Sequence, residues 1–362
     1  MNSNPRILFV ARRYPPSVGG IQTYAKELYT RLCQHCPVTL VALGKDPLFH
    51  LAWFMPYAFC AAVYHVLRHR TDAVFFMDGV TAALAPFLRP FTPARFTVTI
   101  HGAELTFRRA FFSHLMRAGA RACDRTVMVS RATSALAVRN GLPAGKARVI
   151  YQGIYAAIPA GDEHRRLRDR FERSHGIDLG ANPILLNYGR QVPRKGVAEF
   201  IKAGVPLMRD DIRLLISGGG PVRDGIRNAV ESLNLGDRVF TPGWLDDPTL
   251  AMLRREAQLF LMPNIHLSHD AEGFGIAPLE CLYAGLPVVY FDVDALGESL
   301  RDGGFRVPPG DYPAFVERIH RYLDLPDEDK EREKTRVQAF VRAEYSWEKT
   351  TAQYMDVLTG RD

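Results

Sequence analysis

Short apolar runs alternate along the chain with longer segments in which apolar residues recur every three or four positions. Short runs of this kind are typical of buried strands, and the longer spacing is typical of amphipathic helices. The alternation predicts parallel sheets with crossover helices, an α/β fold. In the first half the expected strands are 6–11, 38–42, 73–77, 95–100, 125–129 and 148–151. The expected helices between them are near 21–33, 51–67, 110–121 and 132–139.

A second series of the same kind follows a polar and charged stretch at 161–182. We expect this stretch to be a linker or a short helix. The expected strands of the second series are 183–188, 213–217, 238–241, 258–262 and 287–291. After residue 311 the chain is helical and charged, and Trp347 is expected to anchor the last helix. At 362 residues the chain exceeds what one core usually organises, so we expect two domains.

Composition is that of a folded protein, with 47% hydrophobic and 23% charged residues. The net charge of +7 is unevenly divided. Residues 1–160 carry 19 Lys and Arg against 6 Asp and Glu, whereas residues 161–362 carry 27 against 33. The basic first half predicts an anionic partner there, which could be a membrane surface, a phosphorylated acceptor or a nucleic acid.

The N-terminus and the cysteines bear on location. The first apolar run is about the length of a strand and does not resemble a signal peptide, so we expect a cytoplasmic protein. Five cysteines in a chain of this length indicate reduced thiols without a disulfide framework. Cys33 and Cys36 form a C-x-x-C pair, but no second pair follows to complete a zinc site.

The stretch 270–285 carries the strongest candidate chemistry. Glu272 and Glu280 lie eight residues apart across a Gly-Phe-Gly turn that runs into a helical pattern. A helix start offers N–H donors to phosphate or sugar oxygens, and carboxylates accept hydroxyls. Together these groups suit a nucleotide sugar. The alternative is a surface helix with two solvated glutamates.

A cationic loop follows the first strand of the second series. Gly189-Arg190-Gln191-Val192-Pro193-Arg194-Lys195-Gly196 offers Arg190 and Lys195 at a strand end, with Arg194 as a less certain third cation. Arginine grips phosphate oxygens in pairs and lysine acts as a compact charge, so the two can neutralise a diphosphate. The alternative is a surface loop of solvated cations.

The order of these motifs resembles the retaining GT-B glycosyltransferases of family 4. The matching motifs are Gly19-Gly20, His101-Gly102, Gly189-Arg190 with Lys195-Gly196, Gly218-Gly219-Gly220-Pro221, and Glu272-x7-Glu280 around Gly273-Phe274-Gly275. The resemblance implies two Rossmann-like domains with parallel sheets that face each other across a cleft. It implies an acceptor-binding domain over 1–165, a nucleotide-sugar-binding domain over 166–345, and a C-terminal helix over 346–362 that packs back on the first domain.

The resemblance also implies roles for individual residues. Arg190 and Lys195 would hold the donor diphosphate, Glu280 the ribose, Glu272 the transferred sugar, and His101 the sugar near the reacting carbon. The implied catalytic residues are therefore His101, Arg190, Lys195 and Glu272. The implied donor-binding residues are Gly19, Gly20, Arg190, Lys195, Gly243, Trp244, Leu245, Glu272, Gly273, Phe274, Gly275, Ile276 and Glu280.

The implied mechanism is electrostatic stabilisation of the departing diphosphate, with no covalent nucleophile and no metal or other cofactor. Asp292-Val293-Asp294 has the D-x-D form of a metal motif, but the resemblance argues against that use. The histidine pairs His65/His69 and His266/His269 lack the carboxylate or cysteine neighbours of a metal site.

Two stretches of the basic half are candidate membrane contacts. The run 48–67 is rich in aromatic residues but is interrupted by Pro56, and we expect it to lie in the core. The stretch 107–125 combines aromatic residues with arginines in the manner of an interfacial helix, although an ordinary amphipathic core helix fits equally well. Its candidate acceptor or membrane residues are Arg108, Arg109, Phe111, Phe112, Arg117 and Arg121.

The predicted function is transfer of a hexose from a nucleoside diphosphate sugar to a lipid-linked or polysaccharide acceptor in cell-surface glycan assembly. GDP-mannose is slightly favoured by family habit, with UDP-sugars next, and the location is cytoplasmic or peripheral on the inner membrane face. A sugar-nucleotide epimerase of the same fold is the rival enzyme, and it would convert the donor without any acceptor. A non-catalytic nucleotide- or nucleic-acid-binding protein is the third alternative, which the acidic second half disfavours.

Overall fold

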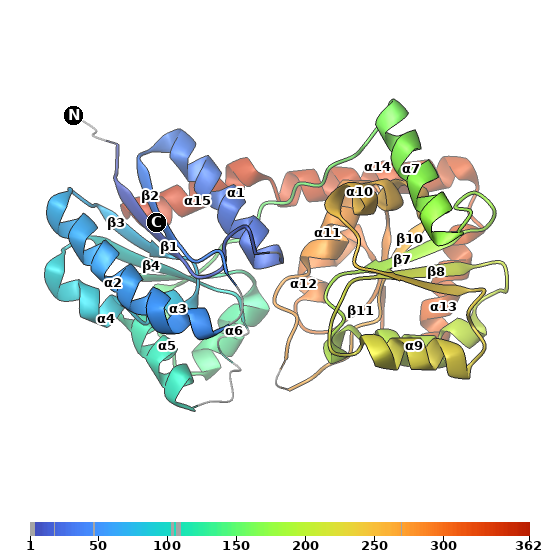
Figure 1. The fold of residues 1–362 in the computed structure, drawn as a ribbon, viewed down its shortest axis with the longest axis horizontal. Coiled ribbons are helices and arrows are strands. Elements are labelled where there is room, and N and C mark those ends of the chain that lie inside the picture. The colour runs from blue at the N-terminus through green and yellow to red at the C-terminus, as the bar shows by residue number, and fades with distance from the viewer. Residues whose placement is uncertain (1–3, 18, 46–47, 103–104, 106–109, 269) are drawn as a thin grey trace. The chain divides into compact units, whose positions relative to one another are not determined.

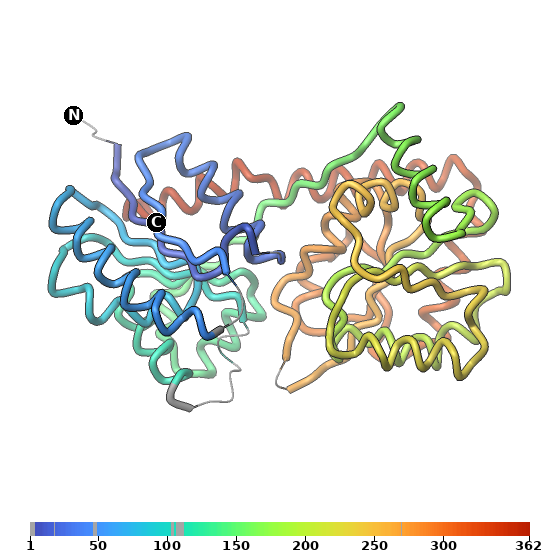
Figure 2. The backbone as a smooth tube through the Cα atoms, viewed as in Figure 1, coloured from blue at the N-terminus to red at the C-terminus, as the bar shows by residue number. Residues whose placement is uncertain are grey.

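The computed structural model describes the chain except residues 1–3, 18, 46–47, 103–104, 106–109 and 269, and the side chains of 48 and 110–111. Two compact units follow from its internal contacts. Unit 1 comprises residues 1–153 and 347–362, and unit 2 comprises residues 154–346. The chain therefore enters unit 1 twice, the second time with its last helix (Figure 2).

Unit 1 is built on a parallel sheet of six strands in the order β2-β1-β3-β4-β5-β6 (Figure 1). The strands are β1 Ile7–Ala11, β2 Val38–Ala42, β3 Ala73–Phe76, β4 Arg95–Ile100, β5 Arg125–Met128 and β6 Ala147–Val149. The helices are α1 Gly20–His35, α2 Leu51–Arg68, α3 Gly79–Ala82, α4 Ala85–Leu88, α5 Ala110–Ala122, α6 Arg131–Arg139 and α15 Trp347–Thr359. Strand order reverses between β1 and β3, which makes the carboxyl ends of these two strands a ligand position by the rule for open α/β sheets.

Helices cover both faces of this sheet. On one face α1 and α15 pack together over β1 and β3, in a core that includes Tyr24, Phe75 and Tyr354. On the other face α2 packs with its Phe54, Ala58 and Ala62 side toward the sheet, near α3 and α4. Burial on both faces explains why β1 and β3 are continuous apolar runs without alternation, whereas β4 also contains the buried Thr97 and Thr99.

Unit 2 contains a second parallel sheet of six strands, in the order β12-β11-β10-β7-β8-β9. The strands are β7 Ile184–Tyr188, β8 Arg213–Ser217, β9 Val239–Gly243, β10 Leu259–Met262, β11 Val288–Phe291 and β12 Phe305–Val307. The helices are α7 Gly161–His175, α8 Val197–Ala203, α9 Arg223–Ser232, α10 Asp247–Glu256, α11 Ile276–Tyr283, α12 Leu296–Leu300, α13 Tyr312–Leu323 and α14 Asp327–Glu344. Counted from β7, this is the 3-2-1-4-5-6 order of the Rossmann fold, and its switch point lies between β7 and β10.

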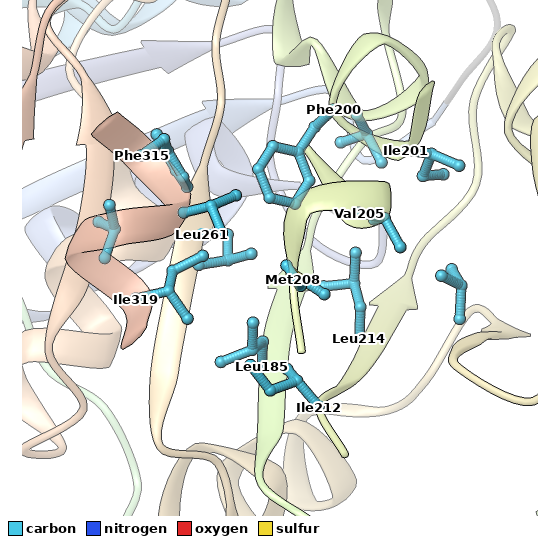
Figure 3. Packing of buried hydrophobic residues seen from close by; sticks show 14 of the residues in the cluster. Leu185, Phe200, Ile201, Val205, Met208, Ile212, Leu214, Leu261, Phe315 and Ile319 are labelled. Carbon is cyan, nitrogen blue, oxygen red and sulfur yellow. The ribbon is translucent and has the colours of Figure 1, made fainter. Parts of the chain in front are cut away.

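One face of this second sheet carries a large apolar core. Phe200 of α8 and Phe315 of α13 meet with ring centroids 5.2 Å apart, above Leu185 and Leu261 of the sheet (Figure 3). This packing fixes β7 and β10 next to each other, and therefore fixes the origins of the loops that follow them. On the opposite side of the unit, α10 lies against α7, and α11 lies against α14.

The predicted α/β architecture with parallel sheets is confirmed. Eleven of the strands were expected, and all their bounds agree within one or two residues, including β6, which was expected at 148–151 and spans Ala147–Val149. The short strand β12 was not expected, because three residues at a sheet edge leave little periodic signal. The polar stretch at 161–182 forms α7 over its first fifteen residues.

Candidate functional site

The loops that follow β7, β8 and β9 are joined to one another through their backbones. Gly189 N donates to Ser217 O at 3.1 Å, and Gln191 N donates to Gly219 O at 2.9 Å. Gly218 N in turn donates to Gly243 O at 2.8 Å. The carboxyl ends of these three neighbouring strands are therefore held together through their backbones.

Glycine is needed where these loops touch. A Cβ atom on Gly218 would lie 2.0 Å from Gly189 O, and one on Gly220 would lie 2.0 Å from Gln191 O. Both glycines also have positive φ, at +123° and +158°, which L side chains rarely adopt. Gly219 between them has open space beside it. The Gly-Gly-Gly sequence thus has two structural glycines and one that faces away from the packing.

Glu272 lies at the centre of a buried polar cluster at the switch point between β7 and β10. Lys195 Nζ donates to its Oε2 at 2.7 Å, and Arg194 Nη1 donates to the same oxygen. Asn264 Nδ2, in the loop after β10, contributes a third contact at 3.4 Å. Arg194 Nε reaches Asp270 Oδ1 at 3.2 Å as well. Two cations from the first loop are therefore held against two carboxylates from the other loop.

The cluster keeps Glu272 ionised. Burial alone would raise the pKa of Glu272, but the charges of Lys195 and Arg194 and their hydrogen bonds outweigh it and lower this pKa to about 2. Burial lowers the pKa of Lys195, and the attraction of Glu272 offsets part of that effect. With two cations bound to its Oε2, Glu272 is a fixed negative charge throughout the physiological range.

Asp294 supports the same segment from the loop after β11. Its Oδ2 accepts a hydrogen bond from the backbone N–H of Glu272 at 2.9 Å, and its Oδ1 lies 2.9 Å from His266 Nδ1. Asp294 is buried and adopts a positive φ of 53°. Asp292, the other carboxylate of the D-x-D sequence, pairs with Arg306 instead. The two aspartates therefore have separate structural partners.

Glu280 belongs to a second network, on α11. Tyr188 Oη, at the end of β7, donates to Glu280 Oε2 at 2.9 Å. Arg254 of α10 donates to Tyr188 Oη at 3.1 Å and lies 3.7 Å from the same carboxylate oxygen. Burial raises the pKa of Glu280, and Arg254 and Tyr188 offset only part of this. Tyr188 and Arg254 are themselves buried, so the carboxylate is held from its inner side.

The turn between the two glutamates is fixed by packing. Phe274 is buried, and its ring meets Tyr345 edge-on with centroids 5.5 Å apart. Gly275 is the N-cap of α11 with φ of 84°, and a Cβ there would come within 2.9 Å of Leu296. The half-buried Gly273 and Ile276 flank these two residues. The side chain of Phe274 thus serves the core, which leaves the backbone at the start of α11 for a ligand.

The remaining predicted donor residues of unit 2 differ in exposure. Arg190 is exposed, and within the described residues it makes no ion pair. Gly243 ends β9 with φ of 87°, Trp244 is 67% exposed, and Leu245 is buried. Arg190 and Trp244 are therefore the accessible members of the predicted set, whereas Lys195 is already paired.

The predicted residues of unit 1 lie around its own switch point. Gly19 is the N-cap of α1 with φ of 154°, and Gly20 is the first residue of that helix. His101 is buried after β4, with Nε2 2.9 Å from the carbonyl oxygen of Met77, which follows β3. A buried pair between Arg12 and Asp78, at 3.6 Å, joins the loops that follow β1 and β3.

Of the predicted acceptor or membrane residues, the structure describes the side chains of Phe112, Arg117 and Arg121 on α5, and these are exposed or half-buried. Phe112 is 48% exposed, so it faces outward rather than toward the core. Arg117 donates to Ser113 O at 3.2 Å, and Arg121 donates to Gly141 O at 2.8 Å. Arg108, Arg109 and the side chain of Phe111 lie outside the described parts of the chain.

No group of three or more His, Cys, Asp or Glu side chains in the described residues is placed to hold a metal ion. Nor does any described helix have the length and apolarity that a membrane span requires.

Several residues of the site were missed or undervalued in the sequence. The sequence favours Lys195 over Arg194 as a phosphate ligand, yet Arg194 contacts both Glu272 and Asp270. Its position beside Pro193, in a single 3-10 turn at Pro193–Lys195, was the available signal. Asn264 had no signal beyond its place after a strand. Tyr188 and Arg254 had none, because their role depends on packing between β7, α10 and α11.

The arrangement can bind an anion and hydroxyl groups together. The exposed Arg190 and the half-buried Lys195 follow the end of β7. The start of α11 lies four residues after Glu272, and Glu272 and Glu280 belong to separate hydrogen-bond networks. Cations and N–H groups stabilise phosphate charge, whereas fixed carboxylates accept hydroxyl hydrogens. These are the requirements for holding a nucleoside diphosphate with a sugar attached.

Two protein-family models match the chain. The model described as "Glycosyltransferase Family 4" matches residues 18–157, and the model described as "Glycosyl transferases group 1" matches residues 168–340. The first match lies in unit 1, apart from its last residues, and the second lies within unit 2.

Curated relatives include a GDP-mannose-dependent alpha-(1-6)-phosphatidylinositol monomannoside mannosyltransferase of Mycobacterium tuberculosis. It is 26% identical, and the match covers 99% of each chain. An alpha-D-kanosaminyltransferase of Streptomyces kanamyceticus is 30% identical over 56% of this chain, but that match spans only 51% of the relative.

Solved structures show the same fold. HepE of Anabaena in complex with UDP and glucose has a TM-score of 0.76 at 17% identity, covering 98% of this chain and 100% of HepE. A sucrose-phosphate synthase from Thermosynechococcus elongatus has a TM-score of 0.79 at 20% identity, covering 99% of each chain. With both family models in their expected order, the chain belongs to the family 4 glycosyltransferases and has the GT-B fold.

Proposed function

We propose that this glycosyltransferase moves a hexose from a nucleoside diphosphate sugar to a lipid-linked or polysaccharide acceptor, with retention of stereochemistry, in cell-surface glycan synthesis. The observation that carries the proposal is the Glu272, Lys195 and Arg194 cluster at the Rossmann switch point of unit 2. Ligands of open α/β sheets bind at such points. A buried carboxylate between two cations is suited to a ligand with both hydroxyls and phosphates.

Each residue then has a separate task. Arg190, which is exposed, meets the diphosphate first, and Lys195 shares its charge between Glu272 and a phosphate oxygen. Glu272 accepts a sugar hydroxyl through Oε1, an oxygen that receives no hydrogen bond from the described residues. Glu280, held by Tyr188, accepts the ribose hydroxyls. Gly20 and His101 of unit 1 keep the phosphate and sugar contacts that the family resemblance implies.

The chemical step is electrostatic. As the bond from the sugar to the diphosphate breaks, negative charge grows on the leaving phosphate oxygens. Arg190, Lys195 and the N–H groups at the start of α11 are preorganised to stabilise that charge, which lowers the barrier. The acceptor hydroxyl enters on the face that the diphosphate leaves, and no protein carboxylate forms a covalent intermediate.

We favour GDP-mannose as the donor and a UDP-sugar as the second choice. The first choice is supported by the GDP-mannose-dependent relative that matches along its whole length. A lipid-linked acceptor and peripheral attachment to an anionic membrane are supported by the same relative, whose name includes a phosphatidylinositol mannoside, and by the basic residues 1–160.

A thermal-shift panel of GDP, UDP, ADP and CMP tests the donor site. A ligand at 100 times its dissociation constant stabilises the native state by about 2.7 kcal/mol, which is measurable. We expect GDP or UDP to stabilise the protein and Lys195→Met to reduce that effect. Gly219→Ala, which has room for its methyl group, controls for nonspecific loss of the fold. Stabilisation by none of the nucleotides would contradict the proposal.

A further inference from the structure

Helix α2 has an exposed aromatic face that the donor chemistry does not use. Along the face, exposed fractions are 67% for Phe49, 50% for Trp53, 55% for Tyr57, 66% for Tyr64 and 66% for Leu67. At about 100° per residue, the four positions on α2 fall within about 80° of one another around the helix axis, and Phe49 lies in the 3-10 turn Leu48–His50 just before the helix. We call these five residues the α2 aromatic face.

The opposite side of α2 is also apolar, and it already packs against the core of unit 1. Phe54, Ala58 and Ala62 are fully buried against the sheet of unit 1. A surface helix normally presents polar residues on its outer side, and a helix that is apolar all round is normally enclosed. The α2 aromatic face therefore exposes more apolar surface than a solvated helix should. Phe87 of α4 and Phe91, 58% and 43% exposed, lie on elements that contact α2 and extend the apolar area.

Charge around this face identifies the partner. Residues 48–71 contain no Asp or Glu, while Arg68 and Arg70 stand at the end of α2. Residues 1–160, which include this helix, carry 19 Lys and Arg against 6 Asp and Glu. Trp and Tyr are the residues that favour the headgroup level of a bilayer, and nearby cations favour anionic lipids. We propose that the α2 aromatic face is the surface through which the protein docks on an anionic lipid bilayer.

This inference deepens the proposed membrane attachment and places it on α2 rather than on α5. Helix α5 presents Phe112 to solvent, but its Arg121 is bound to Gly141 O. Helix α2 begins after β2, on the side of the sheet where the strands end and where ligands of unit 1 are expected. Because the start of α2, with Phe49 and Trp53 of the face, lies at that edge, docking would bring an acceptor in the membrane near the expected ligand position of unit 1.

Sedimentation with vesicles of 30% phosphatidylglycerol in phosphatidylcholine tests the proposal. We expect Trp53→Ser/Tyr57→Ser/Tyr64→Ser to bind at least tenfold more weakly than the unmodified protein, because three aromatic contacts are lost. Phe112→Ser tests α5, and Leu233→Ser, an exposed position in unit 2, is the matched control. Both should bind normally, and binding of the unmodified protein should fall in 0.5 M NaCl.

A second measurement locates the tryptophan. Brominated lipids quench tryptophan only within the bilayer, so quenching should occur with the unmodified protein and disappear in Trp53→Phe, which retains binding. Unchanged binding by the triple variant, or loss of binding in Phe112→Ser alone, would overturn the assignment to α2. Size-exclusion chromatography with light scattering tests whether the face instead joins two copies of the chain. If the unmodified protein is a dimer that does not bind vesicles, and only the triple variant is monomeric, the proposed membrane docking is also overturned. Nucleotide thermal shifts of every variant report on unit 2 separately, so failure of the donor site is distinguished from failure of the docking surface.

Discussion

Glu272→Gln keeps the size of the side chain and removes the charge that faces Lys195 and Arg194. The carboxyl has a pKa of about 2 in the folded protein against an ordinary value of 4.5. Since one pKa unit corresponds to about 1.4 kcal/mol, the ionised group contributes on the order of 3 kcal/mol to the stability of unit 2 at pH 7. The variant should lose that amount.

The sign of the pH dependence follows from the lowered pKa. A carboxyl whose folded pKa is depressed contributes its full stability above the unfolded value of 4.5 and loses it as the pH falls toward 2. The difference in stability between the unmodified protein and Glu272→Gln should therefore be constant from pH 7 to 5. At pH 3 it should be about half as large.

Native-state hydrogen exchange of amides in β7 and β10 measures this in unit 2 alone, which avoids treating two units as one transition. Lys195→Met completes a double-mutant cycle. Glu272→Gln leaves the half-buried Lys195 and Arg194 without the charge they share, whereas the double variant leaves only Arg194, which keeps its pair with Asp270. The double variant should thus lose less than the sum of the single losses, by about 1–3 kcal/mol. Additive losses within about 0.5 kcal/mol, or a pH-independent difference down to pH 3, would refute the assigned ion pair.

Three further substitutions test other parts of the structure. Tyr188→Phe should weaken nucleotide binding about tenfold in calorimetry, because it removes the hydrogen bond that holds Glu280. Tyr290→Phe is the control and should have no effect, because the buried Tyr290 hydroxyl has no partner among the described residues. Gly218→Ala should lower the melting temperature strongly, and equal tolerance of Gly218→Ala and Gly219→Ala would contradict the loop packing. Trp347→Ala should lower the free energy of unfolding in urea by about 3–5 kcal/mol, because the Trp347 ring is buried against Gly153. It should also expose α15 to proteolysis, and unchanged protease resistance would contradict this.

The sheets were predictable because their signal is local. Strands such as β1 and β3 are buried on both faces, so their sequences are unbroken apolar runs. Strand β12 has only three residues and one buried side chain, and its sequence carries no comparable pattern. The strand order was not readable at all, since it depends on which edges pair after the helices cross over.

The candidate site divides in the same way. Glu272 and Glu280 were found because their eight-residue spacing around a Gly-Phe-Gly turn is a sequence feature. Arg254 contacts Tyr188, 66 residues earlier in the chain, and no local pattern connects the two. For α2 the sequence was misleading in another way: its aromatic residues predicted burial, but only one side of the helix can face the sheet.

The two glutamates of the motif are held in opposite electrostatic states. Glu272, in the loop before α11, has cations on its inner side and a pKa lowered to about 2. Glu280, on the helix itself, is half-buried beside the Tyr188 phenol and the more distant Arg254 guanidinium, and burial raises its pKa. Gly275 turns the chain between the two glutamates, so the carboxylates belong to separate networks. Glu280 contacts Tyr188 at the end of β7, and Glu272 contacts Lys195 in the loop that follows β7. The end of β7 and its following loop therefore contact both carboxylates. A ligand that contacts both carboxylates must extend across the switch point.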